Sequence, residues 1–191
     1  MHIRELQPGF GAEIIGYEQD HHPEVNPKEL VTRFGVIFIR DIELDVNGFE
    51  EFAKQFGDMQ DISGKPSVTS TTTDSKYVRA MEYDGTPVDF PAGWFWHAEA
   101  SYLDWRPSGG LLYMTKVPSS GGDTLFADQR TAYNQLSDRM KDYIKDLTCF
   151  HEVGWWFKNK PEAGTEQNVV EIHPVTGEPY LNVSEIFTTR I

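Results

Sequence analysis

The pattern of hydrophobic and polar positions predicts several short strands and a few helices. Residues 36–39 form a continuous apolar run rich in β-branched side chains, which is typical of a buried strand. Further strands are predicted at residues 9–17, 76–83, 111–116, 150–157, 169–173 and 180–183. Residues 67–74 fit either a loop or an edge strand, and residues 159–168 fit a flexible connection. This order of elements predicts a mainly β sandwich or barrel with flanking helices.

Three helices are indicated by capping signals or an apolar stripe. Asn26 is the predicted N-cap of the first helix, which ends at Gly35. Either Asp45 or Asn47 caps the second, and the third begins near residue 136. The side chains predicted to face inward are Phe49, Phe52, Ala53 and Phe56 on the second helix and Met140, Ile144 and Leu147 on the third.

The composition predicts a single cytoplasmic domain. A chain of 191 residues with 39% hydrophobic side chains can bury its own core, so we expect one domain over residues 1–191. The one cysteine, Cys149, excludes an internal disulfide and lies in an apolar stretch, where packing is its expected role. Residues 1–6 lack the apolar core of a signal peptide, and no apolar run is long enough to cross a membrane.

The charge balance limits the partners that we expect. Thirty acidic and seventeen basic side chains give a net charge of −13, which repels phosphate backbones and anionic lipids. Nucleic acid and membranes are therefore not expected partners. A neutral or cationic small molecule would be steered in better than a dianion, although the same charge also simply favours solubility. The sequence leaves a homo-oligomer open.

The candidate chemistry lies in residues 93–101, where His97 and Glu99 follow three aromatic residues. If this stretch is extended, the two side chains share one face about 6.6 Å apart along the strand and could bind one metal ion together. A third ligand on another strand would complete the two-histidine, one-carboxylate face that is typical of oxygen-activating Fe(II) sites. The alternative, a buried core histidine beside a strand-end carboxylate, stays open.

The His-x-acid pattern alone is not specific, because the chain contains it twice. His22 and Glu24 repeat it within a polar run that includes Pro23, which favours a solvated loop. The setting of His97 differs in its aromatic approach and in the later apolar residues 111–114, which could keep water from a reactive centre.

Three segments in order, residues 96–99, 118–124 and 173–190, resemble the taurine dioxygenase (TauD/TfdA-like) family. The resemblance implies an Fe(II)- and 2-oxoglutarate-dependent oxygenase with a double-stranded β-helix, or jelly roll. It implies His97 and Glu99 as iron ligands and the hydroxyl of Thr124 as a hydrogen-bond donor to a carboxylate of 2-oxoglutarate. Read from the residues alone, Gly121–Thr124 is a tight turn. The residues expected on the substrate side are Trp94, Phe95 and Phe187.

Two departures from the family pattern set further expectations. Glu99 stands where most relatives carry aspartate. The family's second histidine ligand and its 2-oxoglutarate arginine lie beyond the segment that ends at Ile191, so we expect a jelly roll that lacks its C-terminal strands and a chain that is inactive as it stands. The resemblance leaves His151 and His173 outside the ligand role. Residues 61–70 contain no histidine, so taurine is not the expected substrate.

The resulting hypothesis is an oxygenase that uses Fe(II), 2-oxoglutarate and O2 to oxidise a C–H bond of a small molecule. Succinate and CO2 would be released. Two alternatives remain open: a non-catalytic jelly-roll module that binds a ligand or partner, and a metal hydrolase or isomerase of cupin type. Succinate formation that depends on Fe(II) and 2-oxoglutarate distinguishes the oxygenase from both.

Overall fold

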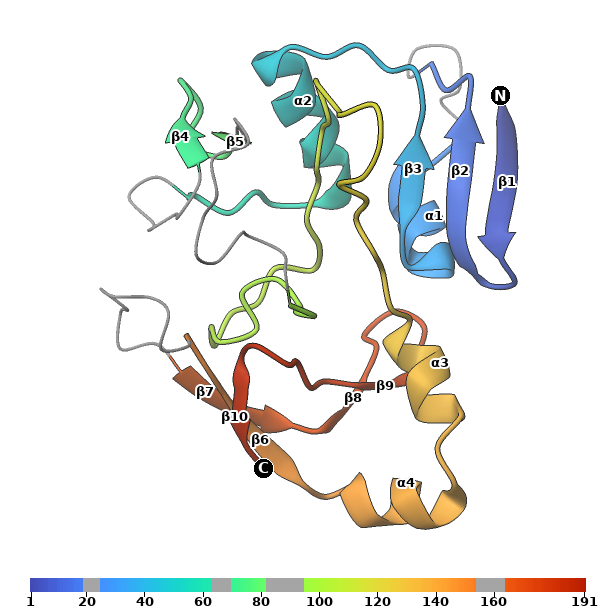
Figure 1. Ribbon diagram of the computed structural model, residues 1–191, viewed down its shortest axis with the longest axis vertical. Coiled ribbons are helices and arrows are strands. Elements are labelled where there is room, and N and C mark those ends of the chain that lie inside the picture. Colours follow the sequence, from blue (N-terminus) through green and yellow to red (C-terminus); the bar gives the residue numbers. More distant parts are fainter. Residues whose placement is uncertain (19–24, 63–69, 82–94, 154–163) are drawn as a thin grey trace. The chain divides into compact units, whose positions relative to one another are not determined.

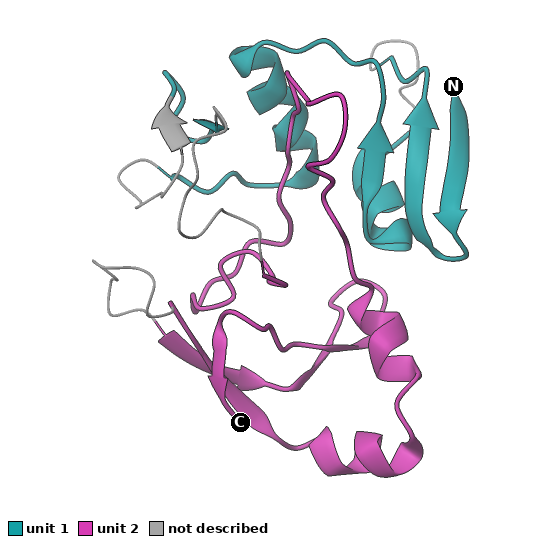
Figure 2. Ribbon diagram, viewed as in Figure 1, with its two compact units in different colours: residues 1–85 teal, residues 86–191 magenta. Residues whose placement is uncertain are grey.

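The structure is a computed structural model that describes residues 1–18, 25–62, 70–81, 95–153 and 164–191 (Figure 1). The chain forms two compact units, Met1–Gly85 and Thr86–Ile191, which Figure 2 shows in different colours. Each unit is described separately. The predicted strands at residues 111–116 and 150–157, the third helix and all candidate site residues belong to the second unit.

A three-stranded sheet forms the centre of the first unit. Strand β2 (Phe10–Ile15) pairs antiparallel with β1 (His2–Gln7) and parallel with β3 (Ile37–Ile39). The predicted strands at residues 9–17 and 36–39 are thereby confirmed. Strand β1 was not predicted because it is an edge strand with mostly exposed side chains and has no clear apolar alternation.

Two helices complete this unit, and both begin at predicted caps. The side chain of Asn26 accepts a hydrogen bond from the Lys28 amide (3.0 Å) at the start of α1 (Pro27–Phe34). Of the two alternatives for α2 (Val46–Ala53), Asp45 is the cap, and a 3-10 turn, η1 (Lys54–Phe56), follows. Their apolar faces close the core with the sheet. The core residues are Ile14, Tyr17 and Phe52, with Leu30, Ile37, Ile39 and Phe56 packed against them.

A short hairpin also belongs to the first unit. Strand β4 (Ser70–Thr72) pairs antiparallel with β5 (Arg79–Met81). The Thr-rich segment therefore contains a strand, which decides between the two alternatives that the sequence left open.

The second unit is built around strand β6 (Thr148–Glu152), which pairs with β7 (Gly164–Asn168) on one side and β10 (Thr188–Arg190) on the other. Strands β8 (Val170–Ile172) and β9 (Pro179–Leu181) form a separate hairpin. The prediction of a flexible connection over residues 159–168 is wrong for β7. Its half-buried side chains, Thr165 and Gln167, are polar, so the strand has no apolar alternation to reveal it.

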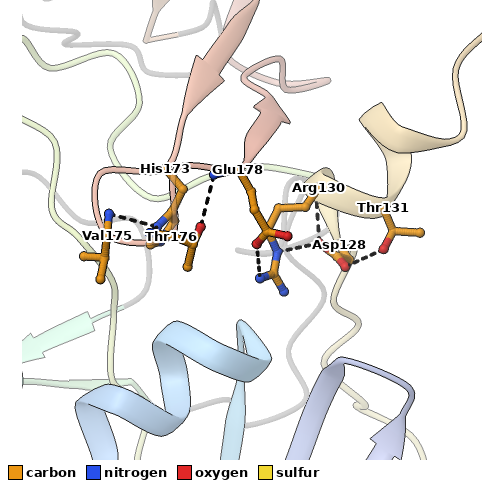
Figure 3. Close-up of polar contacts among 7 residues, drawn as sticks. All are labelled: Asp128, Arg130, Thr131, His173, Val175, Thr176 and Glu178. Atoms are coloured by element: carbon orange, nitrogen blue, oxygen red, sulfur yellow. Dashed lines mark hydrogen bonds and ion pairs between the residues drawn. The ribbon is translucent and has the colours of Figure 1, made fainter.

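Two short helices, α3 (Gln129–Asn134) and α4 (Asp138–Ile144), precede β6. Asp128 caps α3 and forms an ion pair with Arg130 (3.3 Å), which also reaches Glu178 (3.2 Å) beside β9, as Figure 3 shows. Ser137 caps the predicted helix α4. Met140 is 45% exposed, so its prediction as an inward residue is wrong, whereas Ile144 and Leu147 are half-buried.

Residues 95–127 contain neither helix nor strand. The predicted strand at residues 111–116 is therefore wrong. Its apolar side chains remain largely exposed, Leu112 at 60% and Met114 at 54%. An apolar run becomes a strand only where a neighbouring strand satisfies its amides and carbonyls, and this run pairs with none of the described strands. The described elements are nonetheless mainly β with a few short helices, and none of these helices has the length and apolarity to span a bilayer.

Candidate metal site

The segment that carries His97 and Glu99 is a turn, so the expectation of an extended strand is wrong. The Ser101 amide donates to the Ala98 carbonyl (3.4 Å), and the Leu103 amide donates to the Ala100 carbonyl (3.0 Å). Ala100 has a positive φ of 49°, a left-handed conformation that a strand does not accommodate.

The turn nevertheless brings the two predicted ligands together. His97 Nε2 lies 3.3 Å from Glu99 Oε1. The other ring nitrogen, Nδ1, lies 2.8 Å from the carbonyl oxygen of Phe95. The side chains are 30% and 68% exposed, respectively, so the pair is open to an incoming ligand.

The hydrogen bonds of His97 determine what can lie between the pair. Because the Phe95 carbonyl can only accept, Nδ1 carries a proton and donates it. Nε2 then presents a lone pair to a carboxylate, and two acceptors are held together only by a cation, either a proton or a metal ion. The hydrogen bond to Glu99 accordingly raises the pKa of His97, and the same bond lowers the pKa of Glu99.

These donors fit a first-row divalent metal. An imidazole nitrogen and a carboxylate oxygen are the ligand types of non-haem Fe(II) sites. The Phe95 carbonyl holds the His97 ring by its far nitrogen, as outer partners of metal-bound histidines do. The described part of the chain supplies two such donors. Within it, no group of three or more His, Cys, Asp or Glu side chains could hold a metal ion.

The turn between β9 and β10 lies beside the pair. The ring of Phe187 packs edge-on against His97, with centroids 6.2 Å apart, and also against Tyr102 at 5.1 Å. Glu185 accepts a hydrogen bond from the Trp96 amide (3.3 Å). The structure therefore brings the predicted substrate residue Phe187 next to the candidate ligands. Phe95 is exposed nearby, and Trp94 lies outside the described residues.

Thr124 lies in an exposed irregular segment that precedes α3, and no described contact joins it to His97 or Glu99. Gly121 and Gly122, which precede it, have φ values of 76° and 77°. Positive φ values favour glycine at both positions. The tight turn that the residues alone indicated stays a prediction. The role of Thr124 toward 2-oxoglutarate stays a prediction.

The remaining described histidines of this unit have structural environments. The Nδ1 atom of His173 accepts from the amides of Val175 (3.3 Å) and Thr176 (3.1 Å) and so caps the turn between β8 and β9 (Figure 3). His151 is completely buried, and both of its ring nitrogens are within hydrogen-bonding distance of protein atoms. The other His-x-acid pair, His22 and Glu24, lies outside the described residues.

The sequence did not identify Ser101, Gln167 and Glu185 as residues that surround or support the candidate site. Ser101 is 1% exposed, and its hydroxyl lies 3.0 Å from His151, 50 residues away. Gln167 donates to the Ser101 carbonyl (2.6 Å) across 66 residues. No local pattern signals such contacts, because polar side chains in a loop or an edge strand usually face water.

The chain is similar in sequence to several named dioxygenases. It is 25% identical to the alpha-ketoglutarate-dependent sulfonate dioxygenase of Saccharomyces cerevisiae, covering 99% of this chain and 50% of that protein. It is 26% identical to the alpha-ketoglutarate-dependent sulfate ester dioxygenase of Pseudomonas putida, covering 95% of this chain and 65% of that protein. The chain thus spans between half and about two thirds of the length of these curated relatives.

Solved structures show the same fold. The putative alpha-ketoglutarate-dependent taurine dioxygenase of Burkholderia xenovorans superposes with a TM-score of 0.74 at 24% identity, covering 98% of this chain and 67% of that one. The protein AAD-2 in complex with Mn(II) and N-oxalylglycine gives a TM-score of 0.64 at 20% identity, covering 96% and 69%. A family model described as taurine catabolism dioxygenase TauD, TfdA family matches residues 2–191, and the chain therefore belongs to this family.

Proposed function

We propose that this chain is part of an Fe(II)- and 2-oxoglutarate-dependent oxygenase that oxidises a C–H bond of a small molecule. The observation that supports this most directly is the convergence of His97 Nε2 and Glu99 Oε1 at 3.3 Å, with Nδ1 held by a backbone carbonyl. Membership of the TauD/TfdA family supports the same assignment. Residues 1–191 act as one oxygenase-like domain of jelly-roll type in this proposal.

His97 and Glu99 would hold the metal, and the Phe95 carbonyl would keep the imidazole oriented toward it. A further ligand has to come from outside the described residues, because these supply only two donors. When bound, Fe(II) with 2-oxoglutarate and O2 supplies the oxidising chemistry, which converts the co-substrate to succinate and CO2. Phe187, with Phe95 and Trp94, would exclude water on the substrate side.

The names of the relatives indicate the substrate class only broadly. Two of them are named for sulfonates and sulfate esters, and another from Delftia acidovorans is named for (S)-phenoxypropionate. All of these are organic anions, which differ from the neutral or cationic molecule that the net charge of −13 led us to expect. We propose a small organic substrate oxidised in the cytoplasm.

The test uses the natural protein that contains this sequence. Adding Fe(II) and 2-oxoglutarate under anaerobic conditions should produce the visible charge-transfer band of the metal chelate. Exposure to O2 should then convert 2-oxoglutarate to succinate. Absence of the band at saturating metal would contradict the proposed metal site. A band without any succinate would identify a ligand-binding module instead of an oxygenase.

Replacing Thr124 by alanine should weaken the binding of 2-oxoglutarate. The predicted bond joins a hydroxyl to a charged carboxylate, and losing it costs about 1.5 kcal/mol, or roughly a tenfold rise in the Kd. Iron affinity without the co-substrate should not change. The measurement is a 2-oxoglutarate titration of the chelate band, with the exposed Thr189→Ala on β10 as control. An unaltered Kd would show that Thr124 does not bind the co-substrate.

A further inference from the structure

Four residues in the second unit form a closed ring of hydrogen bonds through their side chains and two backbone carbonyls. Ser101 Oγ lies 3.0 Å from His151 Nδ1, and His151 Nε2 lies 3.1 Å from the Asn182 carbonyl. Asn182 Nδ2 donates to Gln167 Oε1 (2.8 Å), and Gln167 Nε2 donates to the Ser101 carbonyl (2.6 Å), which closes the ring. The members come from the turn after Glu99, from β6, from β7 and from the segment after β9.

The direction of every bond in the ring is determined. The Asn182 carbonyl can only accept, so His151 donates from Nε2, and the Ser101 hydroxyl donates to Nδ1 of the neutral ring. Burial lowers the pKa of His151, which agrees with a neutral ring. Arg106 donates to Asn182 Oδ1 (3.1 Å), and this bond fixes both side-chain amides of the ring.

Burial separates this ring from ordinary surface hydrogen bonds. Ser101, His151 and Asn182 are 1%, 0% and 6% exposed. Gln167 is half-buried. A broken bond between the three buried members leaves a polar atom without water, so the buried side of the ring holds its members firmly.

Among the described contacts of the segment that carries the candidate ligands, the ring supplies the buried hydrogen bonds, and Phe187 packs against His97 and Tyr102. The segment belongs to no strand, and its turn contains the left-handed Ala100. Ser101 lies two residues after Glu99 and makes two hydrogen bonds to the sheet. Its side chain bonds to His151 on β6, and its carbonyl accepts from Gln167 on β7. On the other side of His97, the Trp96 amide donates to the exposed Glu185 carboxylate.

We propose that Ser101, His151, Gln167 and Asn182 are positioning residues for the metal site, which hold the turn that aligns Glu99 with His97. The proposal rests on the proposed function for its metal, but its first consequence is measurable without metal. None of the four residues contacts the pair directly. They act through the backbone at Ser101.

Two variants break the ring with little change in shape. Ser101→Ala removes one hydroxyl. Gln167→Glu keeps the length of the side chain but replaces the amide donor with a carboxylate oxygen facing the Ser101 carbonyl. Cys149→Ala is the matched control. Its sulfur is equally buried and contacts His151 Nε2 (3.2 Å) and the Asn182 carbonyl (3.4 Å), but its removal takes away none of the four ring bonds.

The first measurement is amide hydrogen exchange of the metal-free protein, followed by mass spectrometry. In both ring variants, peptides that cover residues 96–103 should exchange about tenfold faster, because the turn opens without global unfolding. Peptides from β1 and β2 should be unchanged. Cys149→Ala should leave residues 96–103 at the wild-type rate. Equal protection in wild type and both ring variants would overturn the proposal.

The second measurement is a Co(II) titration followed by its visible spectrum. Both ring variants should raise the Kd about tenfold, as outer partners of metal ligands do, while Cys149→Ala should not. If wild type binds Co(II) and the ring variants bind it equally well, the positioning role is wrong. If wild type binds no Co(II), the proposed function fails, and the exchange measurement still decides whether the ring holds the turn.

Discussion

Replacing His97 and Glu99 together by alanine is expected to abolish metal binding, with a rise in the Kd of more than about a thousandfold. Loss of an outer partner alone typically weakens a site by about 10–100-fold, and these two residues are the donors themselves. Co(II) or anaerobic Fe(II) titration of the natural protein measures the effect. Far-UV circular dichroism should be unchanged because both side chains are exposed at a turn.

The matched controls separate ligand loss from local disruption. Glu99→Asp keeps a carboxylate at this position and should keep binding within about tenfold. Glu185→Gln keeps an acceptor for the Trp96 amide beside the pair and should leave the affinity unchanged. Wild-type affinity should rise with pH through the raised pKa of His97, because the metal displaces the proton that this pair otherwise holds. Wild-type Co(II) affinity in the double variant would show that His97 and Glu99 are not the metal ligands.

Replacing His151 by leucine should lower the free energy of unfolding by about 2–4 kcal/mol at neutral pH. Leucine has a similar volume but leaves the Ser101 hydroxyl without its acceptor and the Asn182 carbonyl without its imidazole donor, in a site that water does not reach. Urea denaturation measures the loss. Cys149→Ala is the control, because it also removes a buried group from β6, one that contacts His151 and the Asn182 carbonyl, but takes away none of the four ring bonds.

The same residue should make the wild-type protein sensitive to mild acid. Burial lowers the pKa of His151 in the folded state, whereas the unfolded histidine keeps a pKa of about 6.5. As the pH falls below that value, the unfolded chain binds a proton that the folded chain does not bind, so stability decreases until the folded pKa is reached. This part of the decrease between pH 7.5 and 5.5 should be absent in His151→Leu. An identical pH dependence in both proteins would show that His151 is not kept neutral.

Much of the first unit could be predicted because its signals are local. A cap such as Asn26, a stripe such as that of α2 and the apolar run of β3 all lie within a few residues of the element that they specify. The second unit was predicted less well. Strand β7 exposes alternate side chains and turns polar ones inward, and the apolar residues 111–116 pair with no described strand.

The candidate site shows the same limit. The identity and spacing of His97 and Glu99 indicated a metal pair, and the structure brings their donor atoms together. The spacing did not indicate the turn, because the left-handed Ala100 has no sequence signal comparable to a glycine. The spacing also did not indicate what holds the turn, because the residues that bond to Ser101, His151 and Gln167, lie 50 and 66 positions later in the chain.

The closed ring also has a consequence for how this sequence can diverge. Two of its bonds join side chains, Ser101 to His151 and Asn182 to Gln167, so a change at one of these positions leaves its side-chain partner mismatched, whereas the other two bonds accept at backbone carbonyls. A single substitution is then costly, whereas a joint exchange of two neighbours can restore a closed ring. Positions 101 and 151, and positions 167 and 182, should therefore be inherited and replaced as two pairs.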